Sequence, residues 1–235
     1  MREAVVVATV HDPADVHGVH AAEGHSRWTC LARRTGLHGG WEAVEWAWLP
    51  PGGVSGEHLH SRTEELYFIA DGRGEVALDG VARPVGAGAA VLTGLGHRHA
   101  LRNTGDRPLS WLVVELPAPK GPFMRDTATT ATTVIADLRR TGPVDASTVL
   151  TGPLRTVEVT RLPSGATAEL RADGVEHTVF VTDGDGTART GPTTVPLAPG
   201  TALTLPLGTA ARLTAGGHGL ECFHAVLAVP RGAPR

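Results

Sequence analysis

Several residue types that define particular classes of protein are scarce in this sequence. It contains two cysteines, Cys30 and Cys222, with no local pairing, which argues against a disulfide framework and predicts reduced thiols. Its 21 basic residues are outnumbered by 24 acidic ones, giving a net charge of −3 and no basic field to hold a nucleic-acid backbone. No apolar run approaches the ~18 residues that a membrane-spanning helix requires. We therefore expect neither nucleic acid nor a membrane as a partner.

The first residues, MREAVVVATVHDP, lack the small-residue cleavage site that follows the apolar run of a secretory signal. We therefore expect a soluble, cytoplasmic protein. Turn-forming residues, in contrast, are abundant, with Gly 30 and Pro 17 among 235 residues. The apolar runs between them are short and rich in β-branched residues, such as TVFV at 178–181 and LVV at 112–114. This pattern predicts many short strands and an all-β fold.

Comparison of the chain with itself reveals an internal repeat at an offset of 112 residues. Residues 64–74, EELYFIADGRG, align with residues 176–186, EHTVFVTDGDG. Four further residues recur at the same offset: Pro84 as Pro196, Gly88 as Gly200, Leu95 as Leu207, and Gly96 as Gly208. Because glycine and proline fix the geometry of turns, their recurrence predicts two copies of one β unit.

The first copy brings together residue types that bind metals. His58 and His60 stand two apart in a strand-like segment, so alternation directs both side chains to the same side. On the next strand, the same alternation places Glu65 and Tyr67 on one face. His99 supplies a third imidazole at the start of a later strand. Imidazole and carboxylate are usual ligands of divalent transition metals, so these residues form a candidate metal site.

These residues also belong to a longer pattern. The first copy resembles a cupin domain, whose two motifs read G-x5-H-x-H-x3/4-E-x6-G and G-x5-P-x-G-x2-H-x3-N. The first motif is filled by Gly52, His58, His60, Glu65 and Gly72, and the second by Gly88, Gly96, His99 and Asn103. Gly94 stands where the family has proline, which alters the rigidity of a turn but removes no ligand. The resemblance implies a jelly-roll barrel, or double-stranded β-helix.

The resemblance further implies that His58, His60, Glu65 and His99 bind one divalent metal. Glu64 also lies within range of the motif, but Glu65 keeps the family's spacing to the next glycine and is the better candidate. Glu64 is then expected to face outward. Fe, Mn, Ni, Cu and Zn all suit such a ligand set, and the order of affinities does not decide among them.

The second copy keeps the scaffold but not the ligands. The scaffold positions are Gly165, Gly184, Gly200, Pro206 and Gly208. The ligand positions hold Arg171, Asp173, His177 and Ala211, with Ala215 at the position of the asparagine. Arginine stays protonated and alanine offers no lone pair, so we expect one metal per chain, in the first copy. The second copy is expected to support folding or dimerisation, or to bind an anionic ligand through Arg171, Asp173 and His177.

The resemblance covers about 41–117 and 150–230 and implies two tandem cupin barrels. We place the metal-binding barrel at 1–119 and the degenerate, metal-free barrel at 120–235. Residues 120–149, with a short helix or strand around 134–138, are interpreted as the connection and the opening strands of the second barrel. Because cupins commonly pair through sheet faces, a homodimer is expected.

Other side chains near the predicted metal have alternative roles. Tyr67 either donates a proton to bound substrate or packs as a barrel aromatic, and Glu57 is a second candidate for moving a proton. Trp46 and Trp48 share one face of a strand and either line a pocket or belong to the core. The tryptophans of the first copy favour an aromatic or planar ligand. The predicted substrate pocket comprises Trp46, Trp48, Ile69 and Asn103.

The remaining histidines form no recognised metal motif. Five of them precede the first copy and match no zinc spacing, so they are interpreted as surface residues: His11, His17, His20, His25 and His38. His97 is interpreted as an exposed loop residue, with a supporting role beside the metal as the alternative. His218 and His224 belong to no constellation.

The sequence therefore predicts a small-molecule site inside the first barrel. The favoured function is a metal-dependent oxygenase similar to quercetinase, in which substrate bound to the metal reacts with O2. The alternative is a non-oxidative isomerase, cyclase or decarboxylase, in which the metal stabilises an enolate and Tyr67 or Glu57 moves a proton. A non-catalytic ligand-binding protein is the third, disfavoured because no DNA-binding helix pattern accompanies the barrels.

Overall fold

The computed structural model describes residues 4–117 and 133–229, which form almost only strands. The strands of the first half are β1 (Val6–Thr9), β2 (Ala14–His17), β3 (His25–Arg33), β4 (Ala43–Leu49), β5 (Val54–Leu59), β6 (Thr63–Asp71), β7 (Arg73–Leu78), β8 (Val81–Gly86), β9 (Ala89–Thr93), β10 (Arg98–Asn103) and β11 (Leu109–Pro117). Those of the second half are β12 (Thr133–Asp137), β13 (Val144–Asp145), β14 (Leu154–Leu162), β15 (Thr167–Arg171), β16 (Val175–Thr190), β17 (Thr193–Leu197), β18 (Thr201–Leu205) and β19 (Ala210–Ala228). The helical turns are η1 (Val19–Ala21), α1 (Leu138–Thr141) and η2 (Ala146–Thr148).

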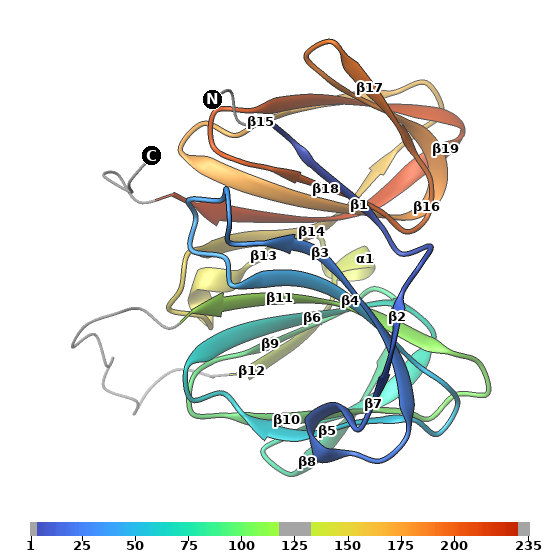
Figure 1. Cartoon of the computed structure of the whole chain (residues 1–235), viewed down its shortest axis with the longest axis vertical. Helices are drawn as coiled ribbons and strands as arrows, with labels where there is room; N and C mark the ends of the chain where they lie inside the picture. Colours follow the sequence, from blue (N-terminus) through green and yellow to red (C-terminus); the bar gives the residue numbers. More distant parts are fainter. Residues whose placement is uncertain (1–3, 118–132, 230–235) are drawn as a thin grey trace.

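The strands build two barrels stacked on one another (Figure 1). In the first barrel, a seven-stranded sheet of order β12-β9-β6-β11-β4-β3-β2 faces a four-stranded sheet of order β5-β10-β7-β8. The second barrel is one eight-stranded sheet of order β1-β18-β16-β19-β14-β13, with β15 added to β19 and β17 to β16. The predicted all-β fold of two tandem barrels is confirmed.

The side chains of β6 alternate between two hydrophobic clusters, one on each face of the strand. Tyr67 and Ile69 point into the first barrel, where they pack with residues such as Val76 and Leu101. Leu66 and Phe68 point the other way and belong to a cluster between the barrels. Because side chains of a strand alternate, a strand that is buried on both faces reads as a continuous apolar run, as this one does.

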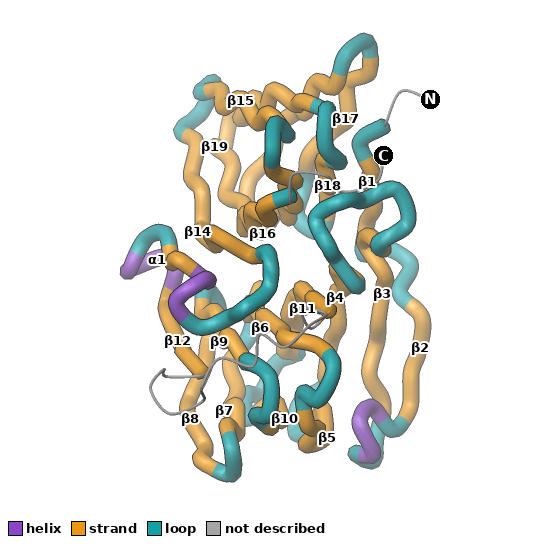
Figure 2. The backbone as a smooth tube through the Cα atoms, turned by 90° about the vertical axis from the view of Figure 1, so that its left-hand side faces the viewer, coloured by secondary structure: helices purple, strands orange, loops and turns teal. Residues whose placement is uncertain are grey.

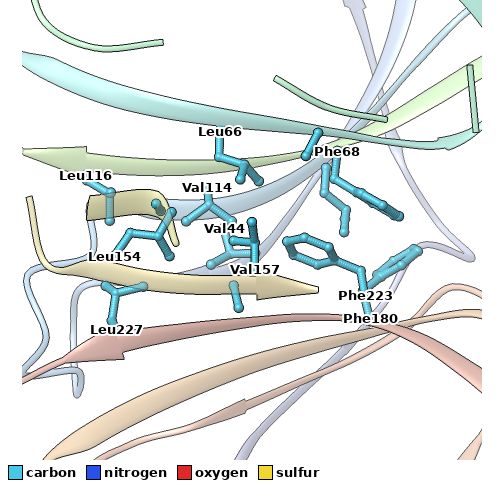
Figure 3. Close-up of a cluster of buried hydrophobic side chains, with 14 of the residues drawn as sticks. Val44, Leu66, Phe68, Val114, Leu116, Leu154, Val157, Phe180, Phe223 and Leu227 are labelled. Carbon is cyan, nitrogen blue, oxygen red and sulfur yellow. The ribbon is translucent and has the colours of Figure 1, made fainter. Parts of the chain in front are cut away.

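The two barrels pack through their large sheets. Figure 3 shows side chains of β4, β6 and β11 meeting those of β14, β16 and β19. At the centre, the rings of Phe68 and Phe223 stack with their centroids 4.5 Å apart. Leu154 and Val157 of β14 are fully buried in the same cluster. This apolar packing fixes one barrel against the other, as in a single domain core.

Two glutamates at equivalent positions of the repeat reinforce this contact. Glu64 accepts hydrogen bonds from the backbone N–H of Thr151 and Gly152, which precede β14. Glu176, 112 residues later, accepts from the backbone N–H of Gly39 (2.7 Å) and from Trp41 Nε1 (2.8 Å), which precede β4. Each barrel therefore holds the loop of the other with one buried carboxylate. Glu64 faces out of its barrel as expected, but into the contact between barrels and not into solvent.

Among the glycines that recur in both copies, Gly72 and Gly184 lie at positions where the backbone does not accommodate a side chain. Gly72 has φ +86, and a Cβ there would lie 2.5 Å from the carbonyl oxygen of Pro108. Its counterpart Gly184 has φ +79, and a Cβ there would lie 2.2 Å from the carbonyl oxygen of Gly219. Both positions combine a left-handed backbone with a close approach of another strand, which only glycine tolerates.

The strand pairing crosses the predicted division between residues 119 and 120. β1 adds to β18 of the second barrel, and β12 adds to β9 of the first (Figure 1). Residues 133–137, interpreted from the sequence as part of the opening of the second barrel, thus complete the sheet of the first. The amino-acid sequence of an edge strand indicates that it pairs with another strand, but it does not show which sheet of the molecule provides that strand. The rest of the predicted connection, 120–132, lies outside the described residues.

Neither cysteine of the described chain forms a disulfide, in agreement with the prediction of free thiols. Among the same residues, no helix has the length and apolar character needed to cross a membrane.

Candidate metal centre

Four side chains of the first barrel converge on one point. β5 carries His58, with His60 directly after it; β6 carries Glu65; and β10 carries His99. β10 lies beside β5 with His99 opposite His58, and the Nε2 atoms of these two residues are 3.1 Å apart. The Nε2 atoms of His60 and His99 are also 3.1 Å apart, and Glu65 Oε2 lies 2.8 Å from His99 Nε2. All four ligand atoms lie within 4.8 Å of one another.

The second nitrogen of each imidazole lies beside an oxygen. His58 Nδ1 is 3.1 Å from the carbonyl oxygen of Gly56, and His60 Nδ1 is 3.2 Å from that of Thr63. His99 Nδ1 is 2.9 Å from the hydroxyl of Thr93. A carbonyl can only accept, so Nδ1 of His58 and of His60 carries the proton, and Nε2 of each keeps its lone pair. Such outer contacts orient histidines that bind metals.

The donor set fits a divalent transition metal. Two nitrogens that each lie about 2.1 Å from one ion, at about a right angle, are separated by about 3.0 Å, close to the observed Nε2 spacing. Glu65 Oε2 is buried and receives no hydrogen bond. Burial raises the pKa of Glu65, but His58, His60 and His99 outweigh it and hold this pKa well below its ordinary value. A buried carboxylate beside the Nε2 lone pairs of His58 and His60 is stabilised by a cation.

A cavity of about 360 Å³ opens beside these ligands. Trp28 and Trp111 form aromatic walls, and the ring of Tyr67 lies 4.4 Å from that of His99. Trp111 Nε1 is buried without a hydrogen-bond acceptor in the structure. A buried donor that is left without an acceptor is costly. The aromatic walls of the cavity suit a flat molecule.

Three acidic groups of the cavity, Glu45, Glu115 and Tyr67, have raised pKa values. Burial raises the pKa of Glu45 on β4 and of Glu115 on β11, both of which line the cavity. Burial, together with the charge of Glu65, raises the pKa of the Tyr67 phenol well above its ordinary value. Each of these groups therefore accepts or keeps a proton more readily than the same group in water.

The sequence of this region matches a family model. Residues 46–115 match the model described as "Cupin domain", which covers all four candidate ligands. The first barrel is a cupin domain. The second barrel repeats its fold. In the first barrel, the motif that spans Gly52–Asn103 contains all four candidate metal ligands.

Solved structures resemble the cupin chain over most of its length. Protein Ylba from E. coli has a TM-score of 0.77 and 9% identity, with 98% of this chain and 93% of that one covered. A salicylate 1,2-dioxygenase from Pseudaminobacter salicylatoxidans has a TM-score of 0.64 and 16% identity, with coverage of 85% and 76%. At these identities the likeness establishes a shared two-barrel fold.

Curated relatives match the cupin domain by sequence. "Polyketide synthase CurC" from Streptomyces cyaneus is 30% identical over 89 residues, which are 38% of this chain and 58% of that protein. "Protein SchB" from Streptomyces halstedii is 41% identical over 56 residues, 24% of this chain and 41% of that protein. The chain thus spans about half the length of the curated relatives that it matches.

The other residues singled out in the sequence lie in different places. Tyr67 lines the cavity. Glu57 is on the outer face of β5, exposed and 3.7 Å from an Nη of Arg98, and is thus separated from the cavity that its predicted role requires. Ile69 is buried deeper in the apolar interior of the cupin barrel. Asn103 is buried, and its amide donates hydrogen bonds to the carbonyls of Leu49 and Arg107, so its role is to tie loops together.

The predicted pocket is corrected for two tryptophans. Trp46 is buried in the cluster between the barrels, and Trp48 packs against the same cluster. On β4 the inward face instead carries Glu45 and Ala47. Both faces of β4 are covered and both carry apolar residues, so composition does not show which face points inward.

His20, interpreted from the sequence as a surface residue, lies against the metal site. Its ring stacks on that of His58, with centroids 3.7 Å apart, and its Nδ1 lies 3.0 Å from Ser55 Oγ. Burial and the neighbouring His58 lower the pKa of His20 to about 4, so the ring is neutral at neutral pH. No spacing rule links residue 20 to the motif, because a loop brings them together. Trp28, Glu45, Trp111 and Glu115 also line the cavity and were not predicted there.

The corresponding region of the second barrel holds a different arrangement. Arg171 is exposed and paired with Glu169. His177 is buried, with its Nδ1 3.0 Å from Nε2 of His224 and its Nε2 3.1 Å from the carbonyl oxygen of Arg171. Ala211 and Ala215 lie in the apolar core of this barrel. Within residues 4–117 and 133–229, the group in the first barrel is the one cluster that fits a metal ion.

Proposed function

We propose that the chain is a metal-dependent enzyme acting on a planar phenolic or enolic molecule, and that its reaction is a dioxygenation of the quercetinase-like type. One observation carries the proposal: His58, His60, Glu65 and His99 converge at the wall of a cavity of about 360 Å³ with aromatic sides. When bound, a divalent transition metal would polarise a substrate hydroxyl and supply the redox chemistry for reaction with O2.

The residues of the chain have separate tasks in this proposal. Trp28 and Trp111 offer aromatic faces on which the flat substrate packs. Tyr67, held protonated by burial, donates a hydrogen bond to an oxygen that gains negative charge. The enclosed walls keep bulk water from the reacting carbon.

The relatives support an aromatic substrate class. One curated relative is named a polyketide synthase, and one solved structure of the salicylate dioxygenase is a complex with gentisate. Hydroxylated aromatic rings of this kind combine a flat face with oxygens that accept hydrogen bonds and can bind a metal. We propose a hydroxylated aromatic compound of the polyketide type as the substrate.

A non-oxidative cyclase or isomerase is the second candidate. It is favoured by the raised pKa values of Glu45, Glu115 and Tyr67 around the cavity, because each of these groups in its protonated form can return a proton to an enolate. The same metal position would serve as a Lewis acid in this reaction.

Oxygen dependence separates the two candidates. Protein stripped with a chelator and reloaded with Fe, Mn, Ni, Cu or Zn is incubated with quercetin, gentisate and a hydroxynaphthoquinone, and substrate loss and O2 uptake are measured. We expect one O2 consumed per product and no turnover under nitrogen or with Zn. Full activity under nitrogen with Zn would favour the cyclase or isomerase. The His99→Ala variant, treated in the same way, controls for metal in solution.

A further inference from the structure

A segment outside the cupin motif lines part of the cavity. Residues 16–24, here called the strap, comprise the last two residues of β2 and the link from β2 to β3, which contains the turn η1. Figure 2 shows this turn beside β5 at the end of the first barrel. Val16, Val19 and His20 of the strap line the cavity together with Trp28 and Trp111. The strap therefore forms part of the wall of the cavity that holds His58 and His60.

His20 connects the strap to a metal ligand. Its ring lies face to face with that of His58, at an interplanar angle of 22°. The hydrogen bond between His20 Nδ1 and Ser55 Oγ fixes the ring in this position. The carbonyl oxygen of Gly56 accepts a hydrogen bond from His58 Nδ1. Among the described histidines, His20 is the one whose ring stacks on the face of His58, since the rings of His60 and His99 are tilted or edge-on to it. Movement of the strap therefore changes the support of this ligand.

The backbone of the strap is held in an unusual conformation. His20 and Ala21 have φ values of 50 and 60, which residues with a side chain rarely adopt. Such conformations persist only where their surroundings enforce them, and they cluster at functional sites. The enforcing contact is with β5, where a Cβ on Gly56 would lie 2.0 Å from the carbonyl oxygen of His20. Glycine at this position is thus a condition for the closed strap.

We propose that the strap is a cover that opens to admit substrate, and that His20 is a positioning residue that holds the ligand His58 in its metal-binding orientation when the cover is closed. The inference rests on the proposed metal-dependent function. A closed strap combines exclusion of water with a complete ligand set, whereas an open strap exposes the cavity and loosens one ligand.

The test uses the full chain with Co2+ alone as the probe, so that no substrate is needed. Cobalt affinity is measured by competition with a chelator, and the visible spectrum reports the ligand geometry. We expect His20→Ala to weaken cobalt binding about tenfold and to change the spectrum, since loss of outer contacts to metal-binding histidines typically costs 10–100-fold. His20→Phe, which keeps a ring over His58, should restore most of the affinity. His218→Ala, an exposed histidine of the second barrel, is the matched control.

A second variant moves the strap without changing any side chain of the cavity. Gly56→Ala should displace His20 and so reproduce both effects of His20→Ala. It should also raise the quenching of tryptophan fluorescence by acrylamide, because Trp28 and Trp111 line the cavity beneath the strap. The control is Gly217→Ala, where an added Cβ meets nothing within 4 Å and φ lies outside the left-handed region.

The outcomes separate the inference from the function on which it rests. Folded His20→Ala and Gly56→Ala proteins with unchanged cobalt affinity, spectrum and quenching would overturn the inference and leave the metal centre intact. A wild-type protein that binds no cobalt would overturn the proposed function and the positioning role of His20. In that case the quenching comparison still decides whether the strap covers the cavity.

Discussion

The double variant His58→Ala/His60→Ala is expected to lose its bound divalent metal while keeping its fold. Each substitution removes a neutral nitrogen whose lone pair is directed at the site by a hydrogen bond on the other side of the ring. Since the loss of an outer contact costs up to about 100-fold in affinity, the loss of two ligands should cost more than about 100-fold. Elemental analysis after dialysis measures the metal, and urea unfolding of the metal-free proteins measures the fold.

The matched control is His97→Ala/His218→Ala, which removes two histidines that pair with aspartates outside the centre. It should retain the metal content of the wild type. Undiminished metal in a folded His58→Ala/His60→Ala protein would contradict the assignment of these ligands.

The largest loss of stability is expected for Glu176→Ala. The carboxylate of Glu176 is fully buried and accepts hydrogen bonds from four N–H groups, those of His38, Gly39, Trp41 and Leu207. Its removal leaves these donors without an acceptor at the contact between the barrels, at about 1–3 kcal/mol for each donor that water cannot reach. We expect the free energy of unfolding to fall by at least about 3 kcal/mol, measured by urea denaturation.

Two controls give this prediction its specificity. Glu176→Gln keeps one acceptor oxygen and should lose less stability than Glu176→Ala. Glu75→Ala removes an exposed glutamate of β7 and should change stability by no more than about 0.5 kcal/mol. Equal stabilities of Glu176→Ala and Glu75→Ala would show that the carboxylate does not hold the barrels together.

The sequence was sufficient to predict the parts of the site that the motif and strand alternation govern. The spacing of His58 and His60 places both side chains on one side of β5, and alternation from Glu65 brings Tyr67 to the same interior. The repeat predicted the second barrel, because the glycines of its turns are required by close backbone approaches. These features depend on local geometry, which a sequence records directly.

Other parts of the site depend on contacts between distant segments. Trp46 and Trp48 face the second barrel because β4 is buried on both faces, and apolar residues on both faces leave its orientation open. β1 and β12 join the sheets across the predicted division, since an edge strand pairs wherever an edge is open. His20 reaches His58 through a loop, and loop paths follow no periodicity.

The central claim is one metal centre per chain, located in the first barrel. Anomalous diffraction at the absorption edge of the metal, from crystals of protein whose metal content is known from elemental analysis, tests it most directly. The account predicts close to one metal per chain and one anomalous peak, between the Nε2 atoms of His58, His60 and His99 and the carboxylate of Glu65. A second peak of equal height near His177 and His224, or no peak among the four predicted ligands, would contradict it.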